Sequence, residues 1–297
     1  MNPWLAVAIT LLFWSSSFAG IRAGLSGGYS PGSLVLLRYL SASAFFIIYA
    51  LFAKKPFRMP NKKDFLKIFL LGFIGISVYH TSLAFGEKTV SAGTASLLIG
   101  AAPVFTAIIA AFILKEKILP IGWVGLLIGF AGITLITFGA GETSIEISKG
   151  ALLVLLSAVS TSIFFVFQKP LFKKYSSIEL TAYFTWAGTI PMLVFLPRLF
   201  LDMQHASAPA TLATVYIGVF PAAIGYVTWA VALSKVNASS VTSSLYIQPV
   251  LAIFIAWIWL GELPEWLSII GGVIAISGVI VVNVFGMRRP SNHKSLT

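Results

Sequence analysis

Residues 91–117 read SAGTASLLIGAAPVFTAIIAAFILKEK, and residues 237–263 read NASSVTSSLYIQPVLAIFIAWIWLGEL. A shift of 146 positions superimposes the two segments without a gap and aligns Pro103 with Pro249. It also aligns the single glutamate near the end of each segment. Crossing the hydrocarbon core of a bilayer takes roughly 20 apolar residues, and both segments meet that length. The two segments are therefore predicted to be membrane spans that arose as two copies of one sequence.

Apolar residues fill nearly the whole chain of 297 residues, and only 10% of the residues are charged. The mean hydropathy is +0.95. A bilayer can accommodate so much apolar surface, and a helix satisfies its own backbone polar groups there. We therefore predict an all-α integral membrane protein with ten transmembrane helices, at residues 4–24, 32–53, 66–86, 91–114, 119–139, 150–170, 179–200, 210–234, 239–260 and 267–286.

Basic residues collect in every second break between these spans. They are densest between residues 54 and 67 and recur in the tail after residue 286, whereas the alternate breaks carry most of the glutamates. The positive-inside rule then places both termini in the cytoplasm, and an even number of spans agrees with this placement. We predict a multi-pass protein of the cell inner (plasma) membrane. Its net charge of +11 reflects topology, so no nucleic-acid partner is expected.

The duplication divides the chain into a first five-helix repeat at 1–140, a second at 150–286 and a cytoplasmic tail at 287–297. Because each half holds an odd number of spans, the second enters the membrane inverted relative to the first. Inverted repeats let one pattern build inward-open and outward-open arrangements around a single midplane site. This indicates a carrier; the alternative is that duplication only makes a stable bundle.

The arrangement of motifs resembles a known family. A Trp-Ser-Ser stretch begins at Trp14, an Arg-Tyr pair lies at Arg38, and the pattern A-x(10)-P-x(12)-E begins at Ala92 and again at Ala238. These features resemble the drug/metabolite transporter superfamily, in particular its EamA-type branch of ten-helix permeases, over residues 4–286. The resemblance implies an exporter or exchanger of small metabolites, with amino acids and similar amphiphilic solutes prominent among the substrates.

Polar and aromatic side chains at membrane depth are candidates for a binding site, because burying polar groups in lipid is costly. We expect a pocket walled by spans one, three, four, six, eight and nine. The predicted substrate-binding residues are Trp14, Ser16, Tyr79, His80, Ser82, Pro103, Phe164, Gln168, Tyr226, Trp229, Tyr246, Gln248 and Pro249. Such a pocket suits a partly apolar solute that also forms hydrogen bonds. A single serine or threonine can instead bond its own helix backbone.

Two ionisable residues inside spans have alternative interpretations. His80 is either a proton relay or a neutral packing residue. Arg38, about two turns into its span, is either a structural residue that binds carbonyls or snorkels to the surface, or one that recruits an anion. No acidic residue lies deep in a predicted span, which argues against a carboxylate proton relay.

Proline and glycine mark positions where helices bend or approach closely. Pro103 and Pro249 lie near the middle of their spans, where proline removes a hydrogen bond and frees a carbonyl. Matching prolines in the two halves favour a site or gate, although a kink needed only for shape is the alternative. Glycines at i, i+3, i+7 and i+10 line one face of the fifth span, and two are echoed in the last, which predicts close packing. These glycines are Gly122, Gly125, Gly129, Gly132, Gly271 and Gly278.

Two other classes of protein, an enzyme and a channel, fit the sequence less well. Residues 24–28 read GLSGG and satisfy the G-x-S-x-G pattern of hydrolases, but no predicted strand precedes them, so an intramembrane enzyme is disfavoured. A passive channel or facilitator lacks the expected rings of charge or a repeated carbonyl filter. No cofactor or metal is expected. The predicted partners are a small-molecule substrate and the lipid bilayer, and the sequence does not choose between monomer and homodimer.

Overall fold

The computed structural model describes residues 1–53, 56–86, 98–139, 149–248, 250–251 and 266–286. The described part of the chain is helical and contains no β-strand element. The first half comprises α1 (Pro3–Ser26), α2 (Pro31–Phe52), α3 (Lys62–Gly72), η1 (Phe73–Val78), α4 (Tyr79–Gly86), α6 (Ala102–Ile113) and α7 (Pro120–Gly139). The second half begins with α8 (Lys149–Gln168), η2 (Lys169–Lys173), α9 (Ser177–Met192), η3 (Leu193–Phe195) and α10 (Leu196–His205). It continues with α11 (Ala208–Ile217), η4 (Gly218–Gly225), α12 (Tyr226–Lys235), α13 (Ala238–Ser243), η5 (Ser244–Ile247), α15 (Trp266–Ile280) and η6 (Val281–Phe285).

Each of the ten predicted spans coincides with helix in the described residues, and the all-helical membrane fold is confirmed. Five described helices are long and apolar enough to cross a membrane, and shorter apolar helices accompany them. Many large apolar side chains lie on the outside, including Phe52, Phe112 and Trp266. In lipid such a surface costs nothing, because the surrounding medium is as apolar as the side chains.

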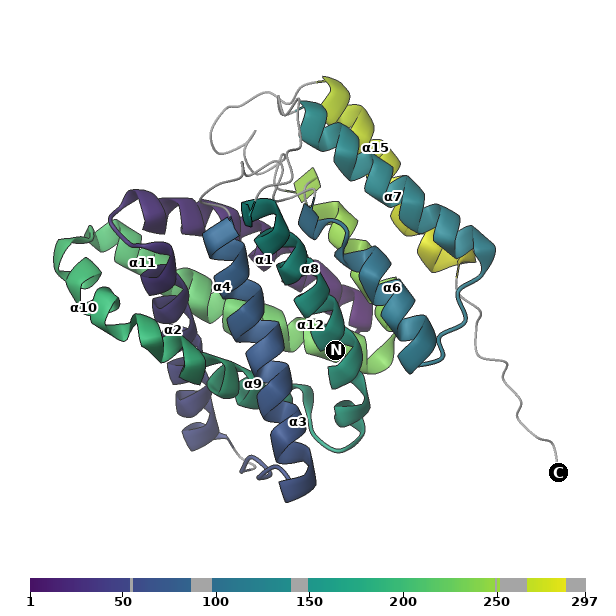
Figure 1. Cartoon of the computed structure of the whole chain (residues 1–297). Coiled ribbons are helices and arrows are strands. Elements are labelled where there is room, and N and C mark those ends of the chain that lie inside the picture. Colours follow the sequence, from purple (N-terminus) through teal and green to yellow (C-terminus); the bar gives the residue numbers. More distant parts are fainter. Residues whose placement is uncertain (54–55, 87–97, 140–148, 249, 252–265, 287–297) are drawn as a thin grey trace.

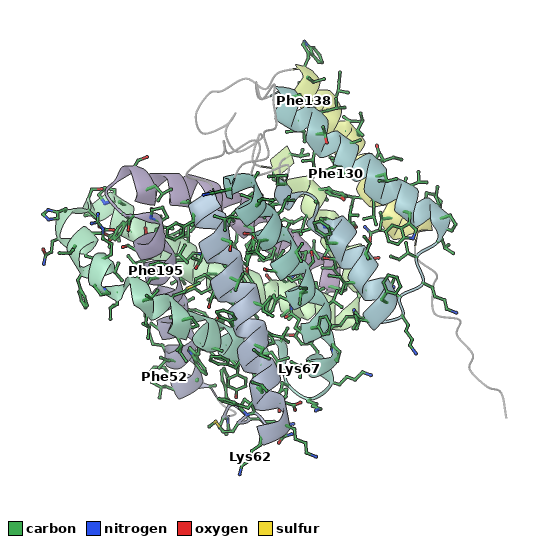
Figure 2. The ribbon with its side chains drawn as sticks, viewed as in Figure 1. Phe52, Lys62, Lys67, Phe130, Phe138 and Phe195 are labelled. Carbon is green, nitrogen blue, oxygen red and sulfur yellow. The ribbon has the colours of Figure 1, made fainter. Side chains whose placement is uncertain are left out.

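The helices pack into one bundle, with the pair α7 and α15 along one side (Figure 1). Figure 2 shows Lys62 and Lys67 at the same end of the bundle as Phe52. The charge pattern predicts this end to face the cytoplasm.

Both halves contain a π-helical segment at the same place. A shift of 146 positions moves η1, at Phe73–Val78, into η4, at Gly218–Gly225. A π-helical turn widens the helix and leaves carbonyls without their usual partner four residues on, and such turns often occur at functional sites. No feature of the hydropathy pattern indicated these segments. In the second half, Pro221 lies inside η4 and removes a backbone donor there.

The fourth span is interrupted, which differs from the expected mid-span kink. A turn at residues 100–101 precedes α6, so Pro103 lies in the first turn of a new helix, where its missing N–H is not needed. The equivalent part of the ninth span is the 3₁₀ segment η5. The expectation for Pro249 lies outside the described residues. Both halves therefore depart from regular α-helix at matching depths.

The predicted glycine faces lie where α7 meets α15. A Cβ on Gly132 would lie 2.3 Å from the backbone nitrogen of Ala275, and one on Gly278 would lie 2.4 Å from that of Gly129. The two backbones therefore pack directly against each other, an approach that only small residues permit.

Two hydrogen bonds mark the axis that relates the repeats. His80 bonds Tyr226, and Ser43 bonds Thr189; in each pair the partners are 146 residues apart. This separation equals the shift that superimposes the two copies of the repeat. Residues related by two-fold symmetry meet only near the axis, so the axis passes close to both pairs.

Candidate functional site

Aromatic side chains from three helices form a buried cluster beside this axis. The ring of Trp14, on α1, lies 5.0 Å from Trp229 and 5.2 Å from Tyr226, both on α12, measured between ring centroids. Phe165, on α8, lies 5.2 Å from Trp229. These tilted geometries are favourable for aromatic pairs. We call Trp14, Phe165, Tyr226 and Trp229 the aromatic cluster.

The π-helical segment of the second half positions Trp14. The Trp14 Nε1–H donates a hydrogen bond of 3.1 Å to the carbonyl oxygen of Pro221, inside η4. A Cβ on Gly225 would lie 3.0 Å from the same indole nitrogen, so the glycine leaves room for the ring. The irregular backbone of η4 thus fixes the orientation of an aromatic side chain in the site.

Hydroxyl groups join α1 to α12 next to the cluster. Thr10 Oγ1 and Thr228 Oγ1 are 2.6 Å apart, so one of the two hydroxyls donates to the other. Both also lie within hydrogen-bond distance of the Gly225 carbonyl oxygen, at 3.1 and 2.9 Å, and the hydroxyl that accepts from its partner can donate to this carbonyl. Thr10 and Thr228 therefore satisfy each other and a helix carbonyl. This link ties the first helix of one half to the eighth span.

His80 and Tyr226 form the polar centre of the site. His80 Nε2 lies 3.0 Å from the Tyr226 hydroxyl, and both side chains are buried. The imidazole ring also packs against Tyr39 at 4.9 Å and Tyr79 at 4.3 Å between centroids. The imidazole is thus enclosed by aromatic rings and hydrogen-bonded to the other half of the chain.

Arg38 lies buried beside this centre. Its side chain is 5% exposed, and the ring of the adjacent Tyr39 packs against His80. The guanidinium carbon lies 5.7 Å from the centroid of the Tyr39 ring. Among the described residues no carboxylate pairs with it, and its Nε has no hydrogen-bond acceptor.

The structure brings six of the predicted site residues together around the axis: Trp14, Tyr79, His80, Phe164, Tyr226 and Trp229. Phe164 lies 6.4 Å from Tyr226 between centroids. The carbonyl oxygen of Tyr79 accepts a hydrogen bond from Ser157 on α8. One compact group therefore contains residues from the first, third, sixth and eighth spans.

The other predicted residues have separate surroundings. Ser16 bonds the Tyr216 hydroxyl at 2.8 Å, and Ser82 is buried on α4. Tyr246 fills the space left by Gly129 and belongs to the core between α7 and α15. Gln168 is buried at the end of α8 with its amide nitrogen unpaired.

The three remaining predicted residues lie in the ninth span and at the break in the fourth. The carbonyl oxygen of Gln248 accepts a hydrogen bond of 3.4 Å from Ser15, which links the ninth span to the first. Pro103 is buried at the start of α6, and the neighbouring Ala102 carbonyl accepts a bond from Ser162. Pro249 lies outside the described residues.

Sequence reasoning missed four residues that contribute to the site: Thr10, Tyr39, Phe165 and Phe184. One signal was available for Phe184. It stands 146 positions after Arg38, so the repeat shift identifies it as the counterpart of a residue that was already a candidate. The other three resemble ordinary core residues, and only their contacts distinguish them.

A groove lies at the end of the bundle that is predicted to face the cytoplasm. It is lined by Tyr49, Phe57, Arg58, Lys174 and Glu179, among others. Two of its charged side chains are engaged, since Glu179 accepts the Arg58 backbone N–H and Lys174 bonds Asp64. The groove is separate from the aromatic cluster.

Comparison with known proteins identifies the family. Residues 2–138 and residues 148–284 each match the EamA-like transporter family. The chain belongs to the EamA-like transporter family. The resemblance seen in the motifs is thereby confirmed, and the two matches correspond to two repeats in one chain.

Two relatives extend over most of the chain. An uncharacterized transporter of Bacillus subtilis (strain 168), YdfC, is 47% identical over 266 residues, which cover 90% of this chain and 86% of YdfC. A probable terminal-alkyne amino-acid exporter of Streptantibioticus cattleyicolor is 37% identical over 289 residues, covering 97% of this chain and 96% of that protein. Both relatives carry transporter names.

A solved crystal structure shares the fold. It superimposes with a TM-score of 0.80 at 22% identity and covers 94% of this chain and 98% of its own chain. At this identity the likeness concerns the fold alone. The family and the named relatives make this protein a multi-pass membrane transporter, and the enzyme interpretation is set aside on that ground.

Proposed function

We propose that this EamA-like protein exports or exchanges small amphiphilic metabolites, amino acids foremost, by alternating access to one central site. The observation that carries the proposal is the hydrogen bond between His80 and Tyr226, two repeat-related residues, inside a cluster of aromatic rings. A site on the axis is equally placed relative to both halves, as alternating access requires. The similarity to the probable terminal-alkyne amino-acid exporter of Streptantibioticus cattleyicolor supports the substrate class.

The chemistry of the cluster fits such a solute. Trp14, Phe165 and Trp229 offer apolar faces, while His80 and Tyr226 offer polar atoms a few ångströms away. Binding sites for small molecules combine an apolar lining with a few placed polar groups. A solute with an apolar side chain and a polar head can satisfy both parts at once.

We expect Trp14→Ala, Tyr79→Ala and Trp229→Ala each to lower uptake of labelled amino acids into everted vesicles by roughly tenfold or more, because each removes an aromatic wall of the site. Expression and membrane insertion should stay normal. The control is Trp266→Ala, since Trp266 is 78% exposed on α15 and away from the cluster. Unchanged transport in all three site variants would reject this binding site.

The proposal includes two oppositely oriented halves, 1–140 and 150–286, with both termini in the cytoplasm. The chain has no cysteine, so single cysteines can be introduced without background labelling. Lys115→Cys and Gly261→Cys stand at equivalent repeat positions. An impermeant maleimide should label the first from the cytoplasmic side and the second from the outside. Labelling of both from one side would exclude the inverted arrangement.

A passive channel or facilitator is the second candidate function. A carrier exposes one site at a time, so an excess of unlabelled solute inside proteoliposomes should drive transient accumulation of labelled solute. A pore would give only downhill equilibration. A screen of labelled amino acids in this counterflow format would also identify the substrate.

A further inference from the structure

Arg38 is a buried intramembrane charge for which the described residues supply no counter-ion, and it lies beside the proposed site. We propose that Arg38 binds the carboxylate of the transported solute, so that the protein selects solutes carrying an anionic head group. This inference rests on the proposed function and names the residue that recognises the head group of the solute.

The described acidic residues are all engaged elsewhere. Asp64 pairs with Lys174 at 2.9 Å, and Asp202 with Arg198 at 2.8 Å. Glu116 accepts the Ala238 N–H at 2.8 Å, and Glu179 accepts the Ser176 N–H at 2.8 Å. In this part of the chain, therefore, no carboxylate neutralises Arg38.

An unpaired guanidinium is costly to keep in such a place. A guanidinium group carries a permanent positive charge in proteins, and a buried charge without a partner is strongly destabilising. The Arg38 Nε finds no acceptor, and one turn along α12 from Tyr226 the Trp229 Nε1–H also lacks one. The site thus has unused donors, and a carboxylate supplies the acceptor oxygens that match a guanidinium best.

The repeat shows that the two sides of the site differ in chemistry. The Arg38 counterpart in the second half is Phe184, and the two backbones have equivalent roles: the Arg38 carbonyl lies against Gly218, and the Phe184 carbonyl against Gly72. Phe184 packs edge-on against Phe164 at 5.0 Å between centroids. One side of the axis is therefore cationic and the other aromatic. A solute should bind with its carboxylate toward Arg38 and its apolar side chain toward the aromatic side.

A purely structural arginine would show different contacts. Such a residue would bond helix carbonyls or reach the membrane surface, but Arg38 has no hydrogen bond to a described carbonyl and is almost fully buried. The Tyr39 ring beside it packs instead against His80, which belongs to the site. Recognition of an anionic group accounts for both observations.

The test compares two probes that differ only in the head group, L-phenylalanine and L-phenylalaninamide. Binding to the purified full chain is followed by tryptophan fluorescence, because Trp14 and Trp229 lie in the site. The wild-type protein should bind the acid at least about tenfold more tightly than the amide. Arg38→Gln should weaken acid binding by roughly 10- to 100-fold, leave amide binding within about threefold, and bring the ratio close to one.

Two further variants accompany this comparison. Arg38→Lys retains the charge but loses the planar fork, so part of the preference for the acid should remain. Arg198→Gln removes an arginine that is already paired at the surface with Asp202, and it should keep the wild-type ratio.

The outcomes separate this inference from the proposed function. A wild-type protein that binds acid and amide equally, or an Arg38→Gln variant that keeps the wild-type ratio, overturns the carboxylate role while leaving transport standing. Equal loss of acid and amide binding in Arg38→Gln would assign Arg38 to structure and also overturn it. Binding of neither probe by the wild-type protein would overturn both proposals. Should Arg38→Gln not fold, the wild-type ratio decides.

Discussion

Gly271→Ala is expected to disrupt the packing of α15 on α7, whereas the same change at the next residue, Gly272→Ala, is expected to be tolerated. A Cβ on Gly271 would lie 2.6 Å from the carbonyl oxygen of Gly132 and 2.7 Å from the backbone nitrogen of Ile136. Backbone atoms inside a helix cannot move aside, so the two helices must separate. At Gly272 the nearest atom is a Val250 methyl carbon at 3.4 Å, which is ordinary contact.

The energies of the two changes should have opposite signs. Overpacking typically costs about 1–3 kcal/mol, and here the loss extends along the helix interface. Alanine is favoured over glycine inside a helix by about 0.5–1 kcal/mol, which helps only where space is available.

Thermal stability in detergent, followed by fluorescence-detected size-exclusion chromatography, measures the difference. Gly271→Ala should lower the Tm by several degrees and reduce the yield of monodisperse protein. Gly272→Ala should match the wild type or exceed it slightly. Equal Tm values for both variants would show that the helices do not meet as closely as the structure has them.

Glu116→Ala is expected to open the end of the bundle that the charge pattern places in the cytoplasm. The Glu116 carboxylate accepts hydrogen bonds from Ala238 N at 2.8 Å, from Ser239 N at 3.2 Å and from Ser239 Oγ at 2.8 Å. It thereby caps the first turn of α13, in the other half of the chain. Lys169 lies 4.0 Å from the same carboxylate and bonds the carbonyl oxygens of Leu233 and Val236. The loop after α6, the start of α13 and the end of α12 are thus held together by Glu116 and Lys169, a polar contact that we call the latch.

The size of this effect follows from the bonds removed. Hydrogen bonds to a charged group contribute about 1.5–3 kcal/mol each, although water replaces part of that loss at an accessible end. A net change of about 1.4–3 kcal/mol would raise the open population roughly 10- to 100-fold.

Cysteine labelling can measure this opening. Ser240→Cys places a thiol at a buried position on α13, and its reaction with an impermeant maleimide in everted vesicles reports access from the predicted cytoplasmic side. The labelling rate should rise by about tenfold or more when Glu116→Ala is added. Lys117→Ala, a change at a neighbouring exposed residue, should leave the rate unchanged. A rate insensitive to Glu116 would mean that the latch does not hold this end closed.

The candidate site shows how far sequence reasoning reaches. It selected Trp14, His80, Tyr226 and Trp229 because polar groups are costly to bury at membrane depth and aromatic groups often line binding sites there. The structure brings these four side chains together. It also grouped Tyr246 with them, but this side chain packs against Gly129 in a different core. Residue type and depth do not reveal which way a helix is rotated, and that rotation decides whether a side chain faces the axis.

The mid-span prolines illustrate a second limit. Proline disfavours regular helix, so a departure near Pro103 followed from its type alone. Whether the chain would kink or break depended on neighbouring contacts. In the structure a turn precedes Pro103, and the adjacent Ala102 carbonyl is satisfied by Ser162 from α8.

The sequence by itself determined the helical membrane fold, because hydropathy and backbone hydrogen bonding in lipid are local properties. It also determined the duplication, because the two halves align with each other directly at a shift of 146 positions. Only the tertiary structure decided that His80 meets Tyr226 on the repeat axis and that Arg38 lies beside them with no counter-ion among the described residues. Those contacts depend on how the helices rotate and cross. Close backbone approaches, such as that of Gly218 to the Arg38 carbonyl, set both, and they arise only when distant segments pack together.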